Sequence, residues 1–250
     1  MNKSDRTYFL RALLIIVAIA ILVGACSTRS ISNSGQTDRY GRSANPFYKG
    51  ELPEIYVLGI DPAKTVTEKD ITSALEGVKR FSLRKGSSVL LIQSGAPIPD
   101  EEMTQALGRN FTVGIYSGVP DQNWGEQSAD MENRARVVRL AAAKGGYETI
   151  ICYWGTLEAS QTGLATKTVS WVPIVGWAVP DETQRMRIRL KVALVDVRSG
   201  AWSTFSPIPF EDAAVSGRYG REGSDQSQVI NLKSKSYVAA VEELIKRYTN

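Results

Sequence analysis

From residue 54 onward, short apolar runs alternate with segments in which apolar residues recur every three or four positions. The apolar runs predict four buried strands, at residues 55–60, 88–93, 111–116 and 148–157. The helically spaced segments predict three helices between these strands, beginning after Thr67, Pro99 and Ser128. Strands that are separated by helices form right-handed crossovers, so this half of the chain predicts a largely parallel sheet.

The helix after Thr67 has a well-marked start. Thr67 and Asp70 have the spacing of a capping box, in which each side chain satisfies a backbone N–H at the helix N-terminus. The apolar residues of this segment recur at Ile71, Ala74, Leu75 and Val78. This spacing predicts an amphipathic helix with these four residues on one face.

After residue 157 the pattern changes from helices to hairpins. Strands are predicted at 166–171, 183–197 and 201–210, with an apolar turn at 172–180 and a tight turn at 198–200. Pro207 and Pro209 place the end of the last strand at a sheet edge. Residues 211–227 predict a loop, and residues 234–248 predict a closing amphipathic helix.

These elements predict a single α/β domain over residues 54–250. Its mixed sheet has early strands that alternate with helices and later strands that form a hairpin meander before the closing helix. A domain of about 200 residues is long enough to bury a substantial core.

The N-terminal 25 residues have the pattern of a secretory signal. A short head carries Lys3, Arg6 and Arg11, an apolar run fills residues 12–25, and Gly24 and Ala25 precede a cysteine. The alternative is an uncleaved transmembrane anchor. A spanning helix needs about 20 apolar residues, and the run between Arg11 and Cys26 is shorter than that.

The sequence Val23-Gly24-Ala25-Cys26 resembles the lipobox of bacterial lipoproteins. This resemblance implies that residues 1–25 are removed and that Cys26 is acylated and becomes the mature N-terminus. The membrane is then a partner through the lipid anchor at Cys26. Ser27 stands where lipoproteins retained in the inner membrane carry Asp, which implies an anchor in the outer membrane, facing the periplasm.

Residues 26–53 are rich in Ser, Gly, Asn and Arg and show no apolar period. A segment of this composition predicts a flexible tether between the acylated cysteine and the domain.

Charge and composition exclude several functions. The formal net charge is +4, from 30 basic and 26 acidic residues, and it falls to about +2 without the first 25 residues. Neither this balance nor secretion favours nucleic acid as a partner. The chain contains no histidine, which excludes Ser-His-Asp and Cys-His catalysis and the common His-containing zinc sites. No metal, other cofactor or catalytic residue is expected.

The second cysteine lies within an apolar run. Cys152 stands between Ile151 and Tyr153 in the predicted strand 148–157, where a cysteine usually acts as a small buried hydrophobic residue. The alternative is a reactive thiol, for which the chain offers no histidine as an activating neighbour.

Two further segments resemble envelope lipoproteins with the fold of the curli secretion lipoprotein and of the outer-membrane activators of penicillin-binding proteins. Residues 140–155 run from a helix through a glycine turn into a strand that ends in Gly155, and residues 194–200 form an Asp-containing strand end followed by a glycine turn. The long proline-rich tether of the synthase activators and the membrane-spanning hairpins of the secretion pore are missing from this chain. The resemblance implies the fold more strongly than the function.

A row of cations alternates with apolar residues along the predicted strand 183–197. The cations are Arg185, Arg187, Arg189 and Lys191. They share one face of the strand, so they form either a binding surface for an acidic partner, a glycan or phosphate-bearing headgroups, or a solvated face with cross-strand acidic or hydroxyl neighbours.

The turn at 172–180 is apolar, whereas hairpin turns are normally polar. Its candidate contact residues are Trp171, Pro173, Ile174, Val175 and Trp177. Such a segment is buried under the domain's own loops, covered by a partner, or inserted at a membrane surface.

Three functions follow from these features. The first is a non-enzymatic binding, assembly or regulatory component of an envelope complex, with an envelope protein or further copies of itself as partners. The second is a ligand- or glycan-binding module that uses the basic strand. The third, least favoured, is a hydrolase that works through carboxylates such as Asp61, Glu158, Asp196 and Asp212, although nothing in their spacing brings two of them together.

Overall fold

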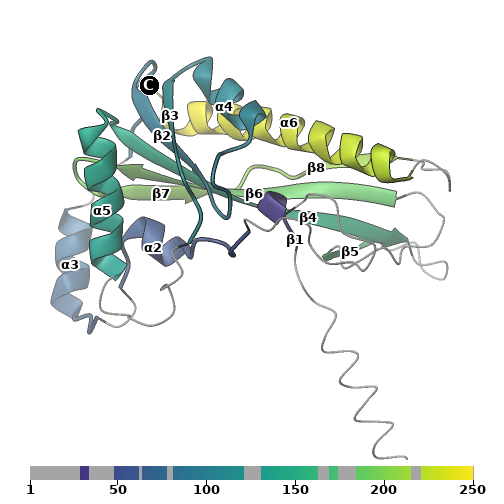
Figure 1. Ribbon diagram of the computed structural model, residues 1–250. Coiled ribbons are helices and arrows are strands. Elements are labelled where there is room, and N and C mark those ends of the chain that lie inside the picture. Colours follow the sequence, from purple (N-terminus) through teal and green to yellow (C-terminus); the bar gives the residue numbers. More distant parts are fainter. Residues whose placement is uncertain are drawn as a thin grey trace, which may run out of the picture.

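The computed structural model describes residues 29–33, 48–61, 64–77, 81–120, 131–162, 169–173, 184–214 and 221–249. In these residues one eight-stranded mixed sheet carries helices on both faces (Figure 1). The elements in chain order are β1 (Arg29–Ser30), η1 (Ile31–Asn33), α2 (Glu54–Leu58), α3 (Glu68–Glu76), β2 (Ser88–Gln93), α4 (Glu101–Gly108), β3 (Thr112–Tyr116), α5 (Met131–Lys144), β4 (Thr149–Thr162), β5 (Val169–Pro173), β6 (Gln184–Asp196), β7 (Trp202–Phe205), β8 (Phe210–Ala214) and α6 (Arg221–Tyr248).

The two long strands β4 and β6 pair along nearly their whole length and form the centre of the sheet. On the other edge of β4 lie β2, β1 and β5 in succession, and on the other edge of β6 lie β7 and then β8. Strands β3, β2 and β4 are parallel, and the remaining pairs are antiparallel. The predicted α/β fold is therefore confirmed, with crossovers in its first half and antiparallel strands in its second.

Each face of the sheet has its own core. On one face α4 and α6 cover a large cluster that includes Val89, Ile151 and Leu190, and α6 runs along this face in Figure 1. On the other face α2 and α5 cover a smaller cluster around Cys152 and Val195. Alternate residues of β4 and β6 thus enter opposite cores, as the period of a strand requires.

The predicted first strand, at residues 55–60, is wrong, because these residues contain the short helix α2. Pro53 precedes the helix in an extended conformation, Glu54 lies in its first turn, and Gly59 ends it with a φ of 70°. Val57 and Leu58 pack on the smaller core. A five- or six-residue apolar run cannot by its period distinguish a strand from one helical turn.

The capping box at Thr67 and Asp70 is confirmed: the Thr67 N–H donates to Asp70 Oδ2 at 2.9 Å, and the Asp70 N–H donates to Thr67 Oγ1 at 3.3 Å. The apolar face of α3 is not buried, because none of its residues is buried. Ile71 and Leu75 are exposed, Leu75 by 70%. Capping interactions are local and form without tertiary packing, so the sequence pattern identified the helix and not its surroundings.

The predicted hairpin between residues 166–171 and 183–197 is also wrong, because β5 and β6 pair with opposite edges of β4. The tight turn between β6 and β7 is present, with the Ser199 N–H donating to Asp196 Oδ1 at 2.6 Å and Gly200 at a φ of 75°. The closing helix begins at Arg221, earlier than predicted, and β8 occupies part of the predicted loop. In the part of the chain described, no helix is long and apolar enough to cross a membrane.

Cys152 is fully buried between two strands of the central sheet, as predicted, and burial raises the pKa of its thiol. We expect Cys152→Ser to lower the free energy of unfolding by about 1 to 3 kcal/mol, because a hydroxyl at this position is desolvated. Chemical denaturation measures this loss. Rapid labelling of the thiol in the native wild-type protein would contradict the buried placement.

Candidate functional site: the docked N-terminal segment

The segment just beyond Cys26 is part of the folded domain. Strand β1 pairs antiparallel with β4, with Arg29 opposite Leu157 and Ser30 opposite Thr156. It occupies the interval between β2 and β5 on the same edge of β4. The structure therefore differs at residues 29–33 from the tether predicted over 26–53. The chain is bound to the sheet three residues after Cys26.

Ile31 fixes this segment in the larger core. Its side chain is 1% exposed and lies over Gly155 of β4. A Cβ atom at residue 155 would lie 2.5 to 2.9 Å from three side-chain carbons of Ile31, closer than carbon atoms pack. Glycine in the middle of a strand often marks such a close approach. The absence of a side chain at residue 155 thus makes the space for Ile31.

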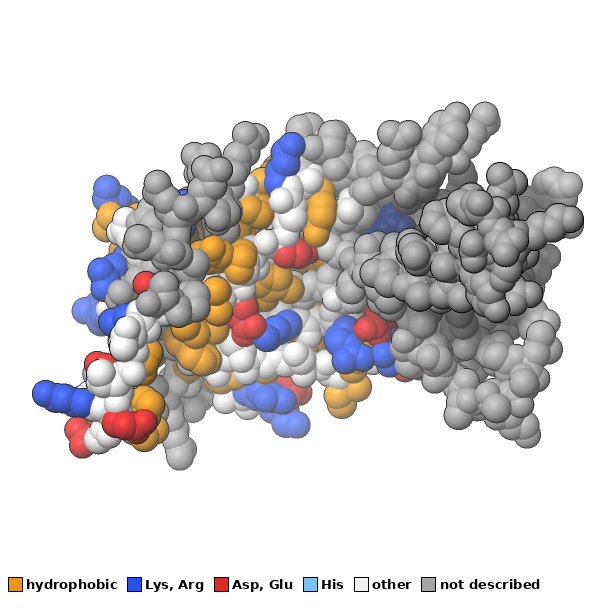
Figure 2. Space-filling model, turned by 90° about the horizontal axis from the view of Figure 1, so that it is seen from below, with side chains coloured by type: hydrophobic (Ala, Val, Ile, Leu, Met, Phe, Trp, Pro, Cys, Tyr) orange, Lys and Arg blue, Asp and Glu red, His pale blue; other side chains and the backbone are white. Residues whose placement is uncertain are grey.

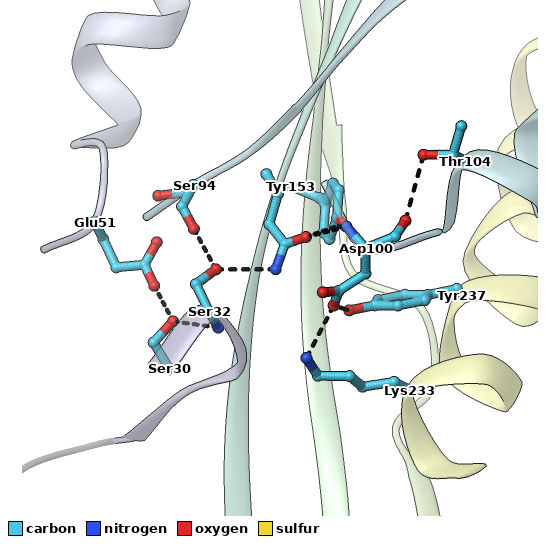
Figure 3. A network of polar contacts seen from close by, with 10 residues as sticks. Ser30, Ser32, Glu51, Ser94, Asp100, Thr104, Tyr153, Lys233 and Tyr237 are labelled. Carbon is cyan, nitrogen blue, oxygen red and sulfur yellow. Dashed lines mark hydrogen bonds and ion pairs between the residues drawn. The ribbon is translucent and has the colours of Figure 1, made fainter. Parts of the chain in front are cut away.

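A network of polar groups surrounds the docked segment and continues into the sheet (Figure 3). Ser32 Oγ donates to the carbonyl oxygen of Ser94 at 2.5 Å and accepts from Gln93 Nε2 at 3.0 Å. The other amide atom, Gln93 Oε1, accepts from the Tyr153 hydroxyl at 2.5 Å and from the Asp100 N–H at 2.6 Å. Both polar ends of the buried Gln93 are therefore satisfied, one of them by η1.

The network ends on the C-terminal helix. The Tyr237 hydroxyl donates to Asp100 Oδ2, and Lys233 Nζ lies 2.9 Å from the same oxygen. Burial raises the pKa values of Tyr153 and Tyr237 well above their ordinary values, so both hydroxyls remain protonated donors. A continuous set of hydrogen bonds thus joins η1 to β2, β4, the start of α4, and α6.

A second stretch of the predicted tether is bound on the other side of η1. The Ser30 hydroxyl donates to a Glu51 carboxylate oxygen, the Leu52 N–H donates to Ser94 Oγ at 2.7 Å, and Trp154 Nε1 donates to the Leu52 carbonyl at 2.7 Å. Burial has the largest effect on the pKa of the Glu51 carboxyl and raises it. The hydrogen bond from Ser30 lowers the same pKa. Residues 48–53 therefore also belong to the domain.

The predicted basic face carries acidic partners. Arg187 Nε lies 2.5 Å from Glu158 Oε2, Arg189 lies 3.7 Å from the other oxygen of Glu158, and Lys191 forms an ion pair with Glu54. The Arg187 side chain is only 14% exposed. Figure 2 shows blue and red side chains next to one another on this face. The arrangement agrees with the alternative of a strand face with cross-strand acids; Arg185 belongs to β6, but its side chain is outside the described residues.

The other predicted site residues lie at or beyond the described parts of the chain. Trp171 and Pro173 belong to β5, where Pro173 is opposite Glu158, and their side chains are not described. Ile174, Val175 and Trp177 lie outside the described residues, as does Cys26.

Two of the carboxylates proposed for hydrolysis, Asp196 and Glu158, lie far apart on the sheet. Asp196 is opposite Thr149, whereas Glu158 is nine residues farther along β4, a separation of about 30 Å along a strand. Asp196 accepts hydrogen bonds from Ser199 in its turn. Across the described ranges, no three acidic or cysteine side chains form a group that could hold a metal ion.

The fold and the docked segment define an α/β domain bound to its own N-terminal chain a few residues beyond a lipobox-like cysteine. Residues 53–247 match the family of YafT bacterial lipoproteins. The chain belongs to this family and is thus a lipoprotein of the bacterial envelope.

A solved structure, the lipoprotein GNA1162 from Neisseria meningitidis, matches with 16% sequence identity and a TM-score of 0.28, over 60% of this chain and 99% of that chain. No curated protein matches. The resemblance to the curli secretion lipoprotein and the synthase activators stays a prediction.

Sequence reasoning did not find this site. Ile31 is an isolated apolar residue in a polar segment, and Gly155 interrupts an apolar strand. Gly155 was the available signal, since a strand glycine indicates that another group approaches closely, but nothing in the sequence identifies that group as Ile31.

We expect Ile31→Ala to lower the free energy of unfolding by about 2 to 5 kcal/mol if the segment stays bound and leaves a cavity, and by less if it detaches. Gly155→Ala should detach it, because the new Cβ takes the position of the Ile31 side chain. Hydrogen exchange of the backbone amides of residues 29–33 distinguishes a bound segment from a detached one. Unchanged protection in Gly155→Ala would contradict the packing described.

Glu51 predicts a pH dependence. Its folded pKa lies above the unfolded value, so the folded state keeps the proton to higher pH and loses stability as pH rises through the interval between them. We expect Glu51→Gln to be more stable than wild type at pH 7 and equal to it below about pH 4. Denaturation at both pH values tests this, with exposed Glu101→Gln as the control.

Proposed function

We propose that this protein is a non-enzymatic binding component of an envelope complex, acylated at Cys26 and anchored in the outer membrane on the periplasmic side. The observation that carries the proposal is the docking of β1 and η1 immediately after that cysteine. A domain with this attachment has a fixed place relative to its lipid anchor, which suits a protein that presents a surface to membrane neighbours.

The chain between Cys26 and the docked segment is short. Arg29 is the third residue after Cys26, and three extended residues span at most about 11 Å. With the segment docked, the domain lies next to the lipid headgroups. A free tether over 26–53 instead allows it to move several tens of ångströms from the membrane. One acyl chain binds marginally and each buried methylene contributes about 0.8 kcal/mol, so several chains hold the anchor firmly.

The residue contacts favour binding over chemistry. Asp100 contacts Tyr237 and Lys233, and Tyr153 donates to Gln93 Oε1. These side chains satisfy one another within the fold, a pattern that rigidifies a domain. The ion pairs of Arg187 and Lys191 weigh against the alternative of a glycan or ligand site on the basic strand. The apolar residues from Trp171 to Trp177 remain our candidate contact surface for a protein partner.

The anchor is tested by mass spectrometry of the membrane-extracted protein. We expect an N-terminal peptide that begins at acylated Cys26, and Cys26→Ser should release the domain from membrane fractions. The variant Ser27→Asp should move the protein from outer-membrane to inner-membrane fractions. An intact N-terminus at Met1 would refute the lipid anchor and leave a transmembrane one.

Partner binding is tested by crosslinking in intact envelopes. We expect Trp177→Ala to reduce recovery of crosslinked partners several-fold while the melting temperature changes little, because interface tryptophans often dominate binding. Trp202→Ala is the matched control, since Trp202 is half-exposed on β7. Equal recovery from a stable Trp177→Ala protein, or its unfolding, would argue against this contact surface.

A further inference from the structure

The two edges of the sheet are protected to different degrees. The edge formed by β7 and β8 is interrupted by Pro207 and Pro209, and β8 contains Glu211 and Asp212. Prolines, charges and short interrupted strands are the features that prevent a sheet edge from pairing with another chain. On the opposite side of the sheet the outer strands are β1, β5 and β3. Of these, β3, beside β2, reads Thr-Val-Gly-Ile-Tyr and has neither a charge nor a proline.

The backbone of β3 offers hydrogen bonds on its outer side. Thr112 donates its N–H to the Ser87 carbonyl, so Thr112, Gly114 and Tyr116 direct their backbone groups toward β2. In a parallel pair the intervening residues direct theirs the other way. The N–H and C=O groups of Val113 and Ile115 thus point outward, and no described strand pairs with them. Ile115 is also 51% exposed.

The pattern of β3 is complementary to itself. In an antiparallel pair centred on Gly114, Val113 lies opposite Ile115 of the second strand and Thr112 lies opposite Tyr116. The outward backbone groups of Val113 and Ile115 then meet as hydrogen-bonded pairs, while Gly114 faces its own copy at the close approach of a non-hydrogen-bonded pair. Cross-strand contacts are aliphatic with aliphatic and hydroxyl with aromatic, with no like charges opposed.

We propose that β3 pairs with β3 of a second copy of this chain, about a two-fold axis at Gly114, to join two sheets into one. A second extended strand satisfies the outward N–H and C=O groups in sequence, and the symmetric register makes this same strand a matching occupant. Self-complementarity of this kind is the requirement of a two-fold interface. Attachment of the chains to one membrane raises their local concentration.

Disulfide trapping in intact envelopes tests the register. In the double variant Thr112→Cys/Tyr116→Cys, residue 112 of one copy lies about 4.5 Å from residue 116 of the other between Cα atoms, within the range of a disulfide. Residues 112 and 116 of one chain are about 13 Å apart and cannot bridge. We expect the double variant to form a covalent dimer on mild oxidation.

Each single variant is the matched control, because residue 112 does not face residue 112, nor residue 116 residue 116, in this register. We expect the two single variants to stay monomeric alone and to crosslink when both are expressed in one cell. No dimer from the double variant overturns the proposal, and so does an equal yield from either single variant. The lipid anchor is read out separately, by the mass of the N-terminal peptide. Failure of the β3 pairing removes the crosslink and leaves that mass unchanged, so the two failures are distinguishable.

A second measurement requires no introduced cysteine. Ile115→Lys introduces a charge at the pairing edge, and we expect it to reduce the dimer fraction of the detergent-extracted, acylated protein at least ten-fold by analytical ultracentrifugation. Ile208→Lys is its control, since Ile208 is 87% exposed away from β3, and it should dimerise as wild type does. A monomeric wild-type protein, or equal dimer fractions in the two variants, contradicts the pairing.

Discussion

The contact of Ile31 with Gly155 is the constraint on which the arrangement of this molecule depends. It places a residue from the N-terminal segment in the core beneath α6, between the ends of β2 and β5 on β4. The polar groups follow from this position, because Ser32 then meets Gln93 and Ser94, and Ser30 meets Glu51. A buried apolar side chain provides the free energy, and the hydrogen bonds fix the register.

The β4–β6 pair explains how one sheet accommodates this segment. Because both strands are longer than any neighbour, each has room for more than one partner along its outer edge. On β4 the parallel strand β2 ends at Gln93, and the positions beyond it are open for β1 and β5. Beyond α2, the described side chains on this face include Glu158, which forms ion pairs with Arg187 and Arg189.

Sequence patterns predicted the elements that local interactions determine, such as capping and apolar period. They failed where contacts between distant parts of the chain determine the structure. Strands β2, β3 and β4 and the capping box of α3 followed from period and capping. The assignment of residues 55–60 failed because so short an apolar run fits both a strand and a helical turn. Ile31 was missed because a single apolar residue has no period, and its partner Gly155 is more than a hundred residues away in the chain.

The central claim is that the domain is held at the membrane by its own N-terminal segment. Neutron reflectometry of the acylated protein on a supported outer-membrane-like bilayer measures the separation directly. The account predicts a protein layer that begins within about 10 Å of the headgroups and moves away from them in Gly155→Ala. A wild-type layer separated from the headgroups by several tens of ångströms of solvent, as a free tether over 26–53 allows, would contradict it.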